Sequence, residues 1–291
     1  MSVLGNRLFV LAQYLVPQHL LSRLMGYVAR NRVHWFKTLL INAFIARYGV
    51  DMQAARGETA EDYENFNAFF TRRLKAHLRP IATRPQDIAS PADGTLGQFG
   101  TLETDTLVQA KGHKYSLQDL LGGDTERALP FINGEYATIY LSPRDYHRVH
   151  MPLSGTLREM VYIPGKLFSV NSVTTGAVPR LFARNERVVC RFDTEQGPLA
   201  IVLVGAMIVS SIHTVWHGPV IPHVGRLQTF SYKDADGTAV HLQKGDELGH
   251  FRLGSTVIIL FESNKIQWEN AITLGKTVKY GEMIGKIKRN V

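Results

Sequence analysis

The sequence predicts an α+β fold, with amphipathic helices at the N-terminus followed by a mainly antiparallel β core. Two features of the chain lead to this prediction. Apolar residues recur at helical spacing within the first 50 residues. From Ile88 onward, short β-branched runs such as YATIYL and TVIILFE alternate with Gly, Pro and Asp, which is typical of strands and turns. The 291 residues, 45% of them hydrophobic, are enough to bury a large core.

Residues 1–85 are expected to be helical and to depend on the remainder of the chain for folding. Apolar spacing predicts one helix that starts just after Pro17 and a second around Phe36. Residues 58–79 predict a third helix, because its acids come first and its bases last, which is the order that the helix dipole favours. No low-complexity linker separates this region from the β-rich core expected over residues 86–291.

Basic residues gather at the N-terminus. The formal net charge is +8, and no acidic residue precedes Asp51. This balance favours an anionic partner, such as nucleic acid, an acidic lipid surface or an acidic small substrate. A nucleic-acid partner is not expected, and the single cysteine, Cys190, excludes a zinc finger. The basic residues of the acid-free segment are Arg7, Arg23, Arg30, Arg32, Lys37 and Arg47.

The two helices after Pro17 have two interpretations. They could pack their apolar faces on the core, which is the ordinary role of an amphipathic helix. Alternatively, they lie at a membrane surface, because aromatic and Leu residues beside Arg and Lys suit a headgroup boundary. The absence of acidic residues over the first 50 positions favours the membrane surface.

Two apolar runs could be mistaken for targeting or spanning segments. Residues 8–16 are similar to a signal-peptide core, but Gln13 interrupts them and no small-residue cleavage site follows, so we expect the N-terminus to be retained. Residues 199–212 fall short of the ~20 residues that a spanning helix needs, and they predict a buried strand pair. A single cysteine allows no intrachain disulfide, which fits a reducing compartment.

Three short segments combine reactive side chains with turn-forming residues. SPADG contains Asp93, SPRDYHRVHMP contains His147 and His150, and GHFRLGSTVIILFE contains Ser255. A Ser-His-Asp set activates a hydroxyl group, because the imidazole takes its proton and the carboxylate orients the imidazole. Ser255 nevertheless leads into an apolar strand, unlike the strand-to-helix elbow of serine hydrolases. Taken singly, each of these residues is more typical of a turn or an ordinary polar position.

These segments resemble the phosphatidylserine decarboxylase family. Residues 253–256, LGST, are similar to its L-G-S-[ST] processing motif. The resemblance extends over nearly the whole chain, and the matching phrases occur in the family's order. They are FNAFFTRRLKAHLRPI at 66–81, SPADG at 90–94, YLSPRDYHRVHMP at 140–152, PGKLFSVN at 164–171, NERV at 185–188, and the run from KGDELG to LGSTVIILFE.

The resemblance implies that the chain cleaves itself between Gly254 and Ser255. The products would be a large chain, residues 1–254, and a small chain of 291 − 254 = 37 residues, residues 255–291. Ser255 would become a covalent pyruvoyl group, and neither a metal nor a diffusible cofactor would be needed. We expect the small chain to stay in the sheet after cleavage, held by backbone pairing and burial.

The family's site residues transfer position by position. Asp93, His150 and Ser255 fall on its self-cleavage triad, with His150 as the base that deprotonates the serine. His147 falls on an auxiliary acid–base residue of the decarboxylation step. All four positions match the family's pattern.

The implied activity is the decarboxylation of phosphatidylserine. The pyruvoyl group would form a Schiff base with the serine amine, and CO2 would leave to give phosphatidylethanolamine. The basic N-terminal helices would hold the protein on an anionic membrane surface. This implies a peripheral protein on the cytoplasmic face of the cell (inner) membrane. The resemblance also implies a homodimer.

Three other functions remain open on the sequence. A serine hydrolase that uses Ser255, His150 and Asp93 on an external ester would stay uncleaved and react with a fluorophosphonate probe. A non-catalytic membrane scaffold would stay uncleaved and carry no reactive carbonyl. A pyruvoyl enzyme for a soluble amino acid would be cleaved but would not depend on lipid.

Overall fold

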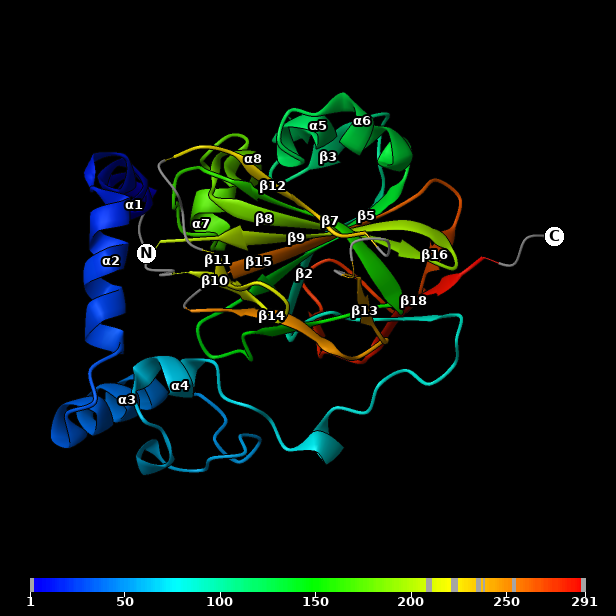
Figure 1. Ribbon diagram of the computed structural model, residues 1–291. Coiled ribbons are helices and arrows are strands. Elements are labelled where there is room, and N and C mark those ends of the chain that lie inside the picture. The colour runs from blue at the N-terminus through cyan, green and yellow to red at the C-terminus, as the bar shows by residue number, and fades with distance from the viewer. Residues whose placement is uncertain are drawn as a thin grey trace.

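Three helices at the N-terminus form an arm along one side of the β structure (Figure 1). The computed structural model describes residues 3–207, 211–220, 225–233, 237, 239–252 and 255–288. The arm consists of α1 (Val3–Leu15), α2 (Gln18–Ala29) and α3 (His34–Tyr48). Pro17 separates α1 from α2, and Gly49, in the left-handed conformation, ends α3. The two helices predicted after Pro17 are therefore confirmed.

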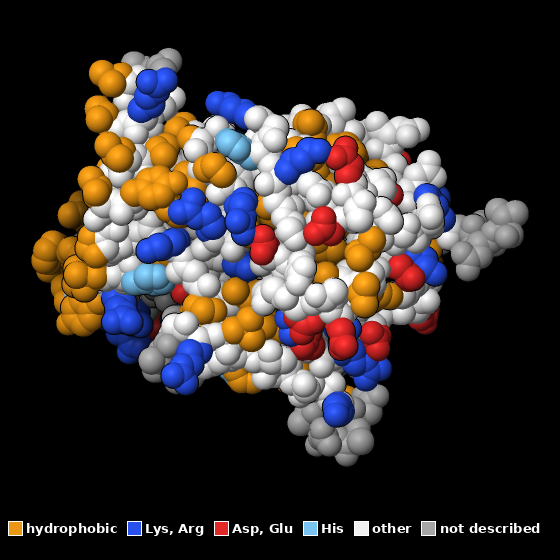
Figure 2. Space-filling view, turned by 90° about the horizontal axis from the view of Figure 1, so that it is seen from above, with side chains coloured by type: hydrophobic (Ala, Val, Ile, Leu, Met, Phe, Trp, Pro, Cys, Tyr) orange, Lys and Arg blue, Asp and Glu red, His pale blue; other side chains and the backbone are white. Residues whose placement is uncertain are grey.

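Helix α2 presents its leucine face outward. The residues that it buries are polar or small: Gln18, Ser22, Gly26 and Ala29. Leu24 is 57% exposed, and similar stripes lie on α1 and α3 (Figure 2). The exposed large apolar residues of these helices include Leu4, Leu8, Leu11, Leu15, Leu20, Leu24, Tyr27, Trp35 and Leu39. Within the described residues, no helix is both long and apolar enough to cross a membrane.

Residues 58–79 do not form the single helix that their charge order predicts. They form η1 (Ala60–Asp62), α4 (Phe66–Phe70) and η2 (Ala76–Leu78). Asn65 caps the start of α4 by accepting a hydrogen bond from the backbone N–H of Ala68. Beyond α4, the buried Arg72 donates to the carbonyl oxygen of Arg144 at 2.8 Å. Such tertiary contacts outweigh the weak dipole preference on which the prediction depended.

A nine-stranded antiparallel sheet dominates the β structure, which confirms the α+β prediction. Its strand order is β12-β7-β8-β9-β15-β5-β2-β17, and β13 also pairs with β7. The strands are β2 (Gly94–Thr101), β5 (Glu135–Leu141), β7 (Gly155–Ile163), β8 (Arg187–Thr194), β9 (Gly197–Gly205), β12 (Gln228–Ser231), β13 (Val240–Leu242), β15 (Ser255–Phe261) and β17 (Thr277–Val278).

Smaller sheets and short helices surround the main sheet. A four-stranded sheet has the order β11-β10-β14-β6, a three-stranded sheet has the order β1-β18-β16, and β3 pairs with β4. These strands are β1 (Asp87–Ala89), β3 (Thr106–Val108), β4 (Lys114–Ser116), β6 (Arg148–His150), β10 (Ile212–Thr214), β11 (Gly218–Val220), β14 (Glu247–Phe251), β16 (Ile266–Trp268) and β18 (Met283–Ile287). The short helices are α5 (Leu117–Leu120), α6 (Thr125–Ala128), η3 (Leu129–Phe131), α7 (Ser172–Thr175) and α8 (Leu181–Arg184).

Strand β15 lies between β9 and β5, and all of its residues are buried. Its alternate side chains enter two different apolar clusters. Val257 and Ile259 pack on one face of the sheet, whereas Ile258 and Leu260 pack on the other. The strand is therefore held by both backbone edges and both faces.

The apolar run 199–212 contributes to two strands, but they do not pair with each other as predicted. Strand β9 ends at Gly205 within the main sheet, and Ile212 begins β10 in the four-stranded sheet. The physical reason is that β8 and β15 already occupy both edges of β9.

Candidate active site

Ser255 is the first residue of β15 and is fully buried. It lies opposite Gly205 of β9 and Leu141 of β5. Its Oγ atom has no hydrogen-bond partner among the described residues. A buried hydroxyl without a partner lowers the free energy of unfolding by about 1–3 kcal/mol, so its presence calls for a functional explanation. Gly254, on the other side of the predicted cleavage bond, lies outside the described residues.

The pairing of β6 with β14 sets the positions of the two candidate histidines. His150 lies opposite Glu247, and the carbonyl oxygen of His147 accepts a hydrogen bond from the N–H of Phe251 at 3.0 Å. Strand β14 runs toward Ser255, and Phe251, the partner of His147, comes later in this strand than Glu247, the partner of His150. His147 therefore lies beside the end of β14 that leads to Ser255, and His150 lies beside its start.

The side chain of His147 is completely enclosed. The ring stacks on Phe70 of α4, with centroids 4.0 Å apart, and neither ring nitrogen has a hydrogen-bond partner among the described residues. Burial, with the nearby charge of Arg72, lowers the pKa of His147 to about 3, and the backbone of Pro143 and Ser142 opposes this shift. The imidazole is therefore neutral at physiological pH. One of its two nitrogens therefore carries a proton, and the other is able to accept one.

His150 has a defined tautomer. Its Nδ1 lies 2.8 Å from the carbonyl oxygen of Gly245, which can only accept, so Nδ1 carries the proton. Its Nε2, 3.1 Å from the hydroxyl of Tyr146, then accepts a hydrogen bond from it. Burial lowers the pKa of His150, and this lowering is opposed by the carbonyl of Gly245, by the charge of Glu247 and, more weakly, by the charge of Asp93. The neutral imidazole thus has its basic nitrogen on the Nε2 side.

Asp93 does not hydrogen-bond directly to His150 in the described structure. Its carboxylate accepts two hydrogen bonds from Nε of Arg79, at 3.1 and 3.2 Å, and another from Nη2 at 2.5 Å. It also accepts a hydrogen bond from the backbone N–H of Tyr280 at 2.8 Å. The ring of Tyr280 stacks on His150 with centroids 4.0 Å apart. Tyr280 therefore connects the predicted acid to the predicted base.

The structure adds three contact residues that sequence reasoning missed. Arg79 lies at the end of a predicted helix, within the family phrase at 66–81 but without a predicted role, and Tyr280 belongs to a phrase, YGEMIG, typical of a turn. Phe70 lies in an aromatic run without any polar signal. Their roles depend on contacts with Asp93, His150 and His147 that are distant in sequence. Among the described residues, no group of three or more His, Cys, Asp or Glu side chains is arranged to hold a metal ion.

The burial of His147 predicts that acid weakens the fold. Its pKa falls from 6.5 to about 3 on folding, so between these values the unfolded chain binds more protons, and the free energy of unfolding decreases as pH falls. The comparison uses a Ser255→Ala background, which cannot begin the expected cleavage. In this background the free energy of unfolding should decrease between pH 7 and pH 5, and the decrease should be about 2 kcal/mol smaller in His147→Leu. Denaturant unfolding at both pH values measures the difference. The exposed His77→Leu is the control, and an equal pH dependence in both variants would contradict a buried, neutral imidazole.

Comparisons with known proteins place the chain in a family. The sequence profile described as phosphatidylserine decarboxylase matches residues 66–286, and a second profile, PSD, matches residues 8–49. A phosphatidylserine decarboxylase proenzyme of Ectopseudomonas mendocina is 57% identical over 280 residues, covering 96% of this chain and 98% of the relative. The proenzyme of Pseudomonas aeruginosa strain LESB58 is 56% identical over 285 residues, covering 98% of this chain and 99% of the relative. These matches confirm the resemblance found in the sequence, and the chain belongs to the phosphatidylserine decarboxylase family.

Proposed function

We propose that the chain is a self-cleaving proenzyme that decarboxylates phosphatidylserine through a pyruvoyl group made from Ser255. Family membership supports the reaction and the enzyme class, a carboxy-lyase. The relatives are named proenzymes, which is the name of a precursor that requires processing. The observation in this chain that carries the proposal is the buried hydroxyl of Ser255 at the start of β15, which has no hydrogen-bond partner among the described residues.

Self-cleavage uses atoms of the chain and one water molecule. Ser255 Oγ attacks the carbonyl carbon of Gly254, a C–O bond forms and the amide C–N bond breaks, which leaves an ester. Loss of the Ser255 α-proton then expels the Gly254 carboxylate and leaves dehydroalanine. Its imine tautomer takes up water and releases ammonia. The small chain then begins with a pyruvoyl group.

His150 is the proposed base for this attack. The proton on Nδ1 is held by the carbonyl of Gly245, so Nε2 is the nitrogen able to accept a proton. The negative charge of Asp93 favours the protonated imidazole that results. Arg79 fixes the carboxylate of Asp93 in place, and Tyr280 contacts both Asp93 and His150. Asp93 is therefore proposed to act on His150 through charge and through Tyr280.

His147 is the proposed acid–base residue of the decarboxylation. The pyruvoyl carbonyl supplies an electron sink, because it condenses with the substrate amine and accepts the electron pair that CO2 leaves behind. The chain must then return a proton to the former α-carbon. The neutral imidazole of His147, with one protonated and one basic nitrogen, supports this role, as does its place beside Ser142, the residue after the β5 partner of Ser255.

A serine hydrolase that uses the same residues has less support. Its nucleophile would have to reach an external ester, but Ser255 is fully buried and paired on both sides. An attack on the chain's own carbonyl requires no access from solvent. Burial of Ser255 therefore favours self-cleavage over hydrolysis.

The helical arm is proposed to hold the protein on an anionic membrane surface, as a peripheral protein on the cytoplasmic face of the cell membrane. Exposed leucines follow one stripe of α1, and the first 50 residues contain no acid. Apolar insertion and charge attraction act together at such an interface.

Residues 1–85 and 86–291 are proposed to act as a membrane-facing region and a catalytic core that fold together. The N-terminal region has its own apolar cluster, which includes Ile41 and Phe70. Phe70 also stacks on His147 of the core. This contact supports mutual dependence of the two regions. A homodimer remains a prediction from the family resemblance.

Intact mass under denaturing conditions tests the cofactor. We expect two chains from the parent protein, with the smaller one starting at residue 255 and lighter by one ammonia than the corresponding peptide. Ser255→Ala should remain one chain of 32.6 kDa, because it lacks the attacking oxygen. A single chain in both preparations would refute the pyruvoyl group and return the serine hydrolase to first place.

Matched histidine variants test the division of roles. His150→Gln should stay uncleaved, because the base is lost. His147→Gln should still cleave but should lose roughly 100-fold or more in decarboxylation rate, the usual contribution of a positioned acid or base. Mass spectrometry measures cleavage, and release of CO2 from phosphatidylserine measures turnover. Cleavage that fails in His147→Gln and proceeds in His150→Gln would reverse the assignment.

Leucine variants test the membrane-facing arm. The triple change Leu11→Gln, Leu15→Gln and Leu24→Gln should weaken binding to phospholipid vesicles by at least about tenfold. Each of these exposed leucines would contribute about 1.5–3 kcal/mol to binding when the bilayer buries it. Cosedimentation measures this binding. A matched triple, in which the exposed Leu129, Leu227 and Leu274 become Gln, should bind like the parent. Equal losses in the two triples would argue against the arm as the docking face.

A further inference from the structure

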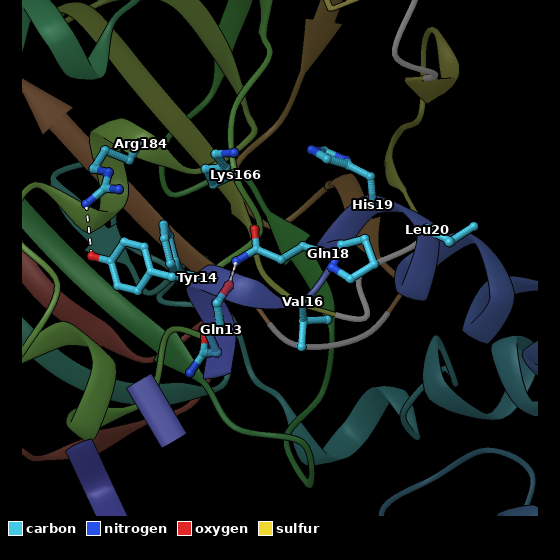
Figure 3. Close-up of a pocket in the computed structure, with 10 residues that line it drawn as sticks. Gln13, Tyr14, Val16, Gln18, His19, Leu20, Lys166 and Arg184 are labelled. Atoms are coloured by element: carbon cyan, nitrogen blue, oxygen red, sulfur yellow. Dashed lines mark hydrogen bonds between the residues drawn. The ribbon is translucent and has the colours of Figure 1, made fainter. Parts of the chain in front are cut away.

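A cavity of about 280 Å³ lies at the corner between α1 and α2 (Figure 3). Pro17 makes the corner, and the opposite wall comes from the loop before α7 and the end of α8. The residues that line it are Gln13, Tyr14, Val16, Pro17, Gln18, His19, Leu20, Lys166, Phe168 and Arg184. The proposed reaction uses none of them.

Two buried glutamines fasten this corner to the β core. The backbone N–H of Leu167 donates to Oε1 of Gln18 at 2.7 Å, and the N–H of Ser169 donates to Oε1 of Gln13 at 2.8 Å. Gln18 Nε2 also donates to the carbonyl of Gln13 at 2.7 Å. The cavity is therefore a preformed feature of the fold, and the helices cannot open it without breaking these bonds.

The chemistry of the cavity is basic and aromatic. The guanidinium of Arg184 lies 5.0 Å from the ring centroid of Phe168 and 5.6 Å from that of Tyr14, and it donates to the Tyr14 hydroxyl at 3.3 Å. Lys166 completes the basic lining, whereas Nε2 of His19 lies 2.9 Å from the carbonyl oxygen of Gly165. No carboxylate lines the cavity, and neither Arg184 nor Lys166 forms an ion pair in the described structure. Two cations without an ion-pair partner around one cavity favour an anion.

The surroundings indicate where that anion comes from. Leu15 and Leu20 on either side of the corner are both exposed, and so is Leu24 one turn farther along α2. In Figure 2, basic side chains lie directly beside the apolar stripe of the arm. A phosphate group with acyl chains attached fits this combination, because its charge meets the cations while its chains meet the leucines.

The cavity also lies near the reactive end of the main sheet. The side chain of Asn185, next to Arg184, accepts a hydrogen bond from the backbone N–H of Phe168 and donates to its carbonyl oxygen. It also donates to the carbonyl oxygen of Gly205 at 2.9 Å. Gly205 is the β9 partner of Ser255. One hydrogen-bonded connection thus joins the cavity wall to the strand residue opposite the nucleophile.

We propose that this cavity is a binding subsite for the phosphodiester of an anionic phospholipid, with Arg184 and Lys166 as the charged ligands. The proposal rests on the proposed membrane-facing role of the arm. The subsite sets the height of the bilayer headgroups relative to the Ser255 end of the sheet. It is separate from the residues that perform the chemistry.

Vesicle cosedimentation of the uncleaved Ser255→Ala protein tests the subsite without any turnover. The vesicles contain phosphatidylcholine alone, or phosphatidylcholine with phosphatidylglycerol, which is anionic but has no amine to react. Lys166→Gln with Arg184→Gln should lose roughly 150-fold or more in affinity for the anionic vesicles, because each cation loses a charge-assisted hydrogen bond to the phosphate. Arg7→Gln with Arg23→Gln removes the same charge from the exposed surface of the arm and should lose only about 20- to 30-fold, the diffuse attraction of two cations. Equal losses in the two pairs would leave only diffuse attraction and overturn the proposal.

Two further measurements distinguish the source of the phosphate and detect misfolded variants. Short-chain phosphatidylglycerol should compete with the vesicles, whereas inorganic phosphate at the same concentration should not. Equal competition by phosphate would overturn the assignment to a lipid. Removal of Arg184 could disturb packing, so the exposed Lys166 is also changed alone: Lys166→Gln should keep the fold and lose about tenfold or more. Cleavage of the Ser255 parent is scored separately, so failure of the subsite is distinct from failure of the proposed function.

Discussion

The pairing of β15 on both of its edges is the constraint on which the rest of the structure depends. Residues 255–261 bond to β5 on one side and to β9 on the other, and their side chains fill two apolar clusters. None of these contacts needs the peptide bond that precedes Ser255. A cut at that position removes one covalent link from a strand that the sheet and the core already hold. The proposed self-cleavage is therefore compatible with a native state that persists afterward.

The same constraint explains why the proposed chemistry depends on the complete fold. Asp93 and His150 belong to the segment that would become the large chain, but Tyr280, which contacts both, belongs to the segment that would become the small chain. Tyr280 contacts the proposed acid and the proposed base from the segment between β17 and β18, both of which belong to the future small chain. A partly folded chain would lack these contacts. Folding would thus precede cleavage because the reactive arrangement spans both future chains.

Sequence patterns predicted the fold class, the helices after Pro17 and the family, because each depends on local spacing or on short motifs. They failed where distant contacts decide. Residues 58–79 break into short elements once Arg72 turns inward to a carbonyl of the core. The run 199–212 divides between two sheets because both edges of β9 are already paired. Tyr280 and Arg79 have no local signal for their contacts with His150 and Asp93, so only the folded chain shows them.

Helix α2 shows most clearly how periodicity leaves function undetermined. Its leucine spacing predicts an amphipathic helix, but the spacing is the same whether the leucines face a core or a bilayer. The inward face consists instead of Gln18, Ser22, Gly26 and Ala29, residues that allow close approach and, through Gln18, a hydrogen bond to the core. The helix is thus held by its polar and small side while the leucines remain free. Such an outward apolar surface would suit the proposed membrane-facing role, and Asn185, which hydrogen-bonds to Phe168 and to Gly205 opposite Ser255, connects the loop that receives α2 to the main sheet.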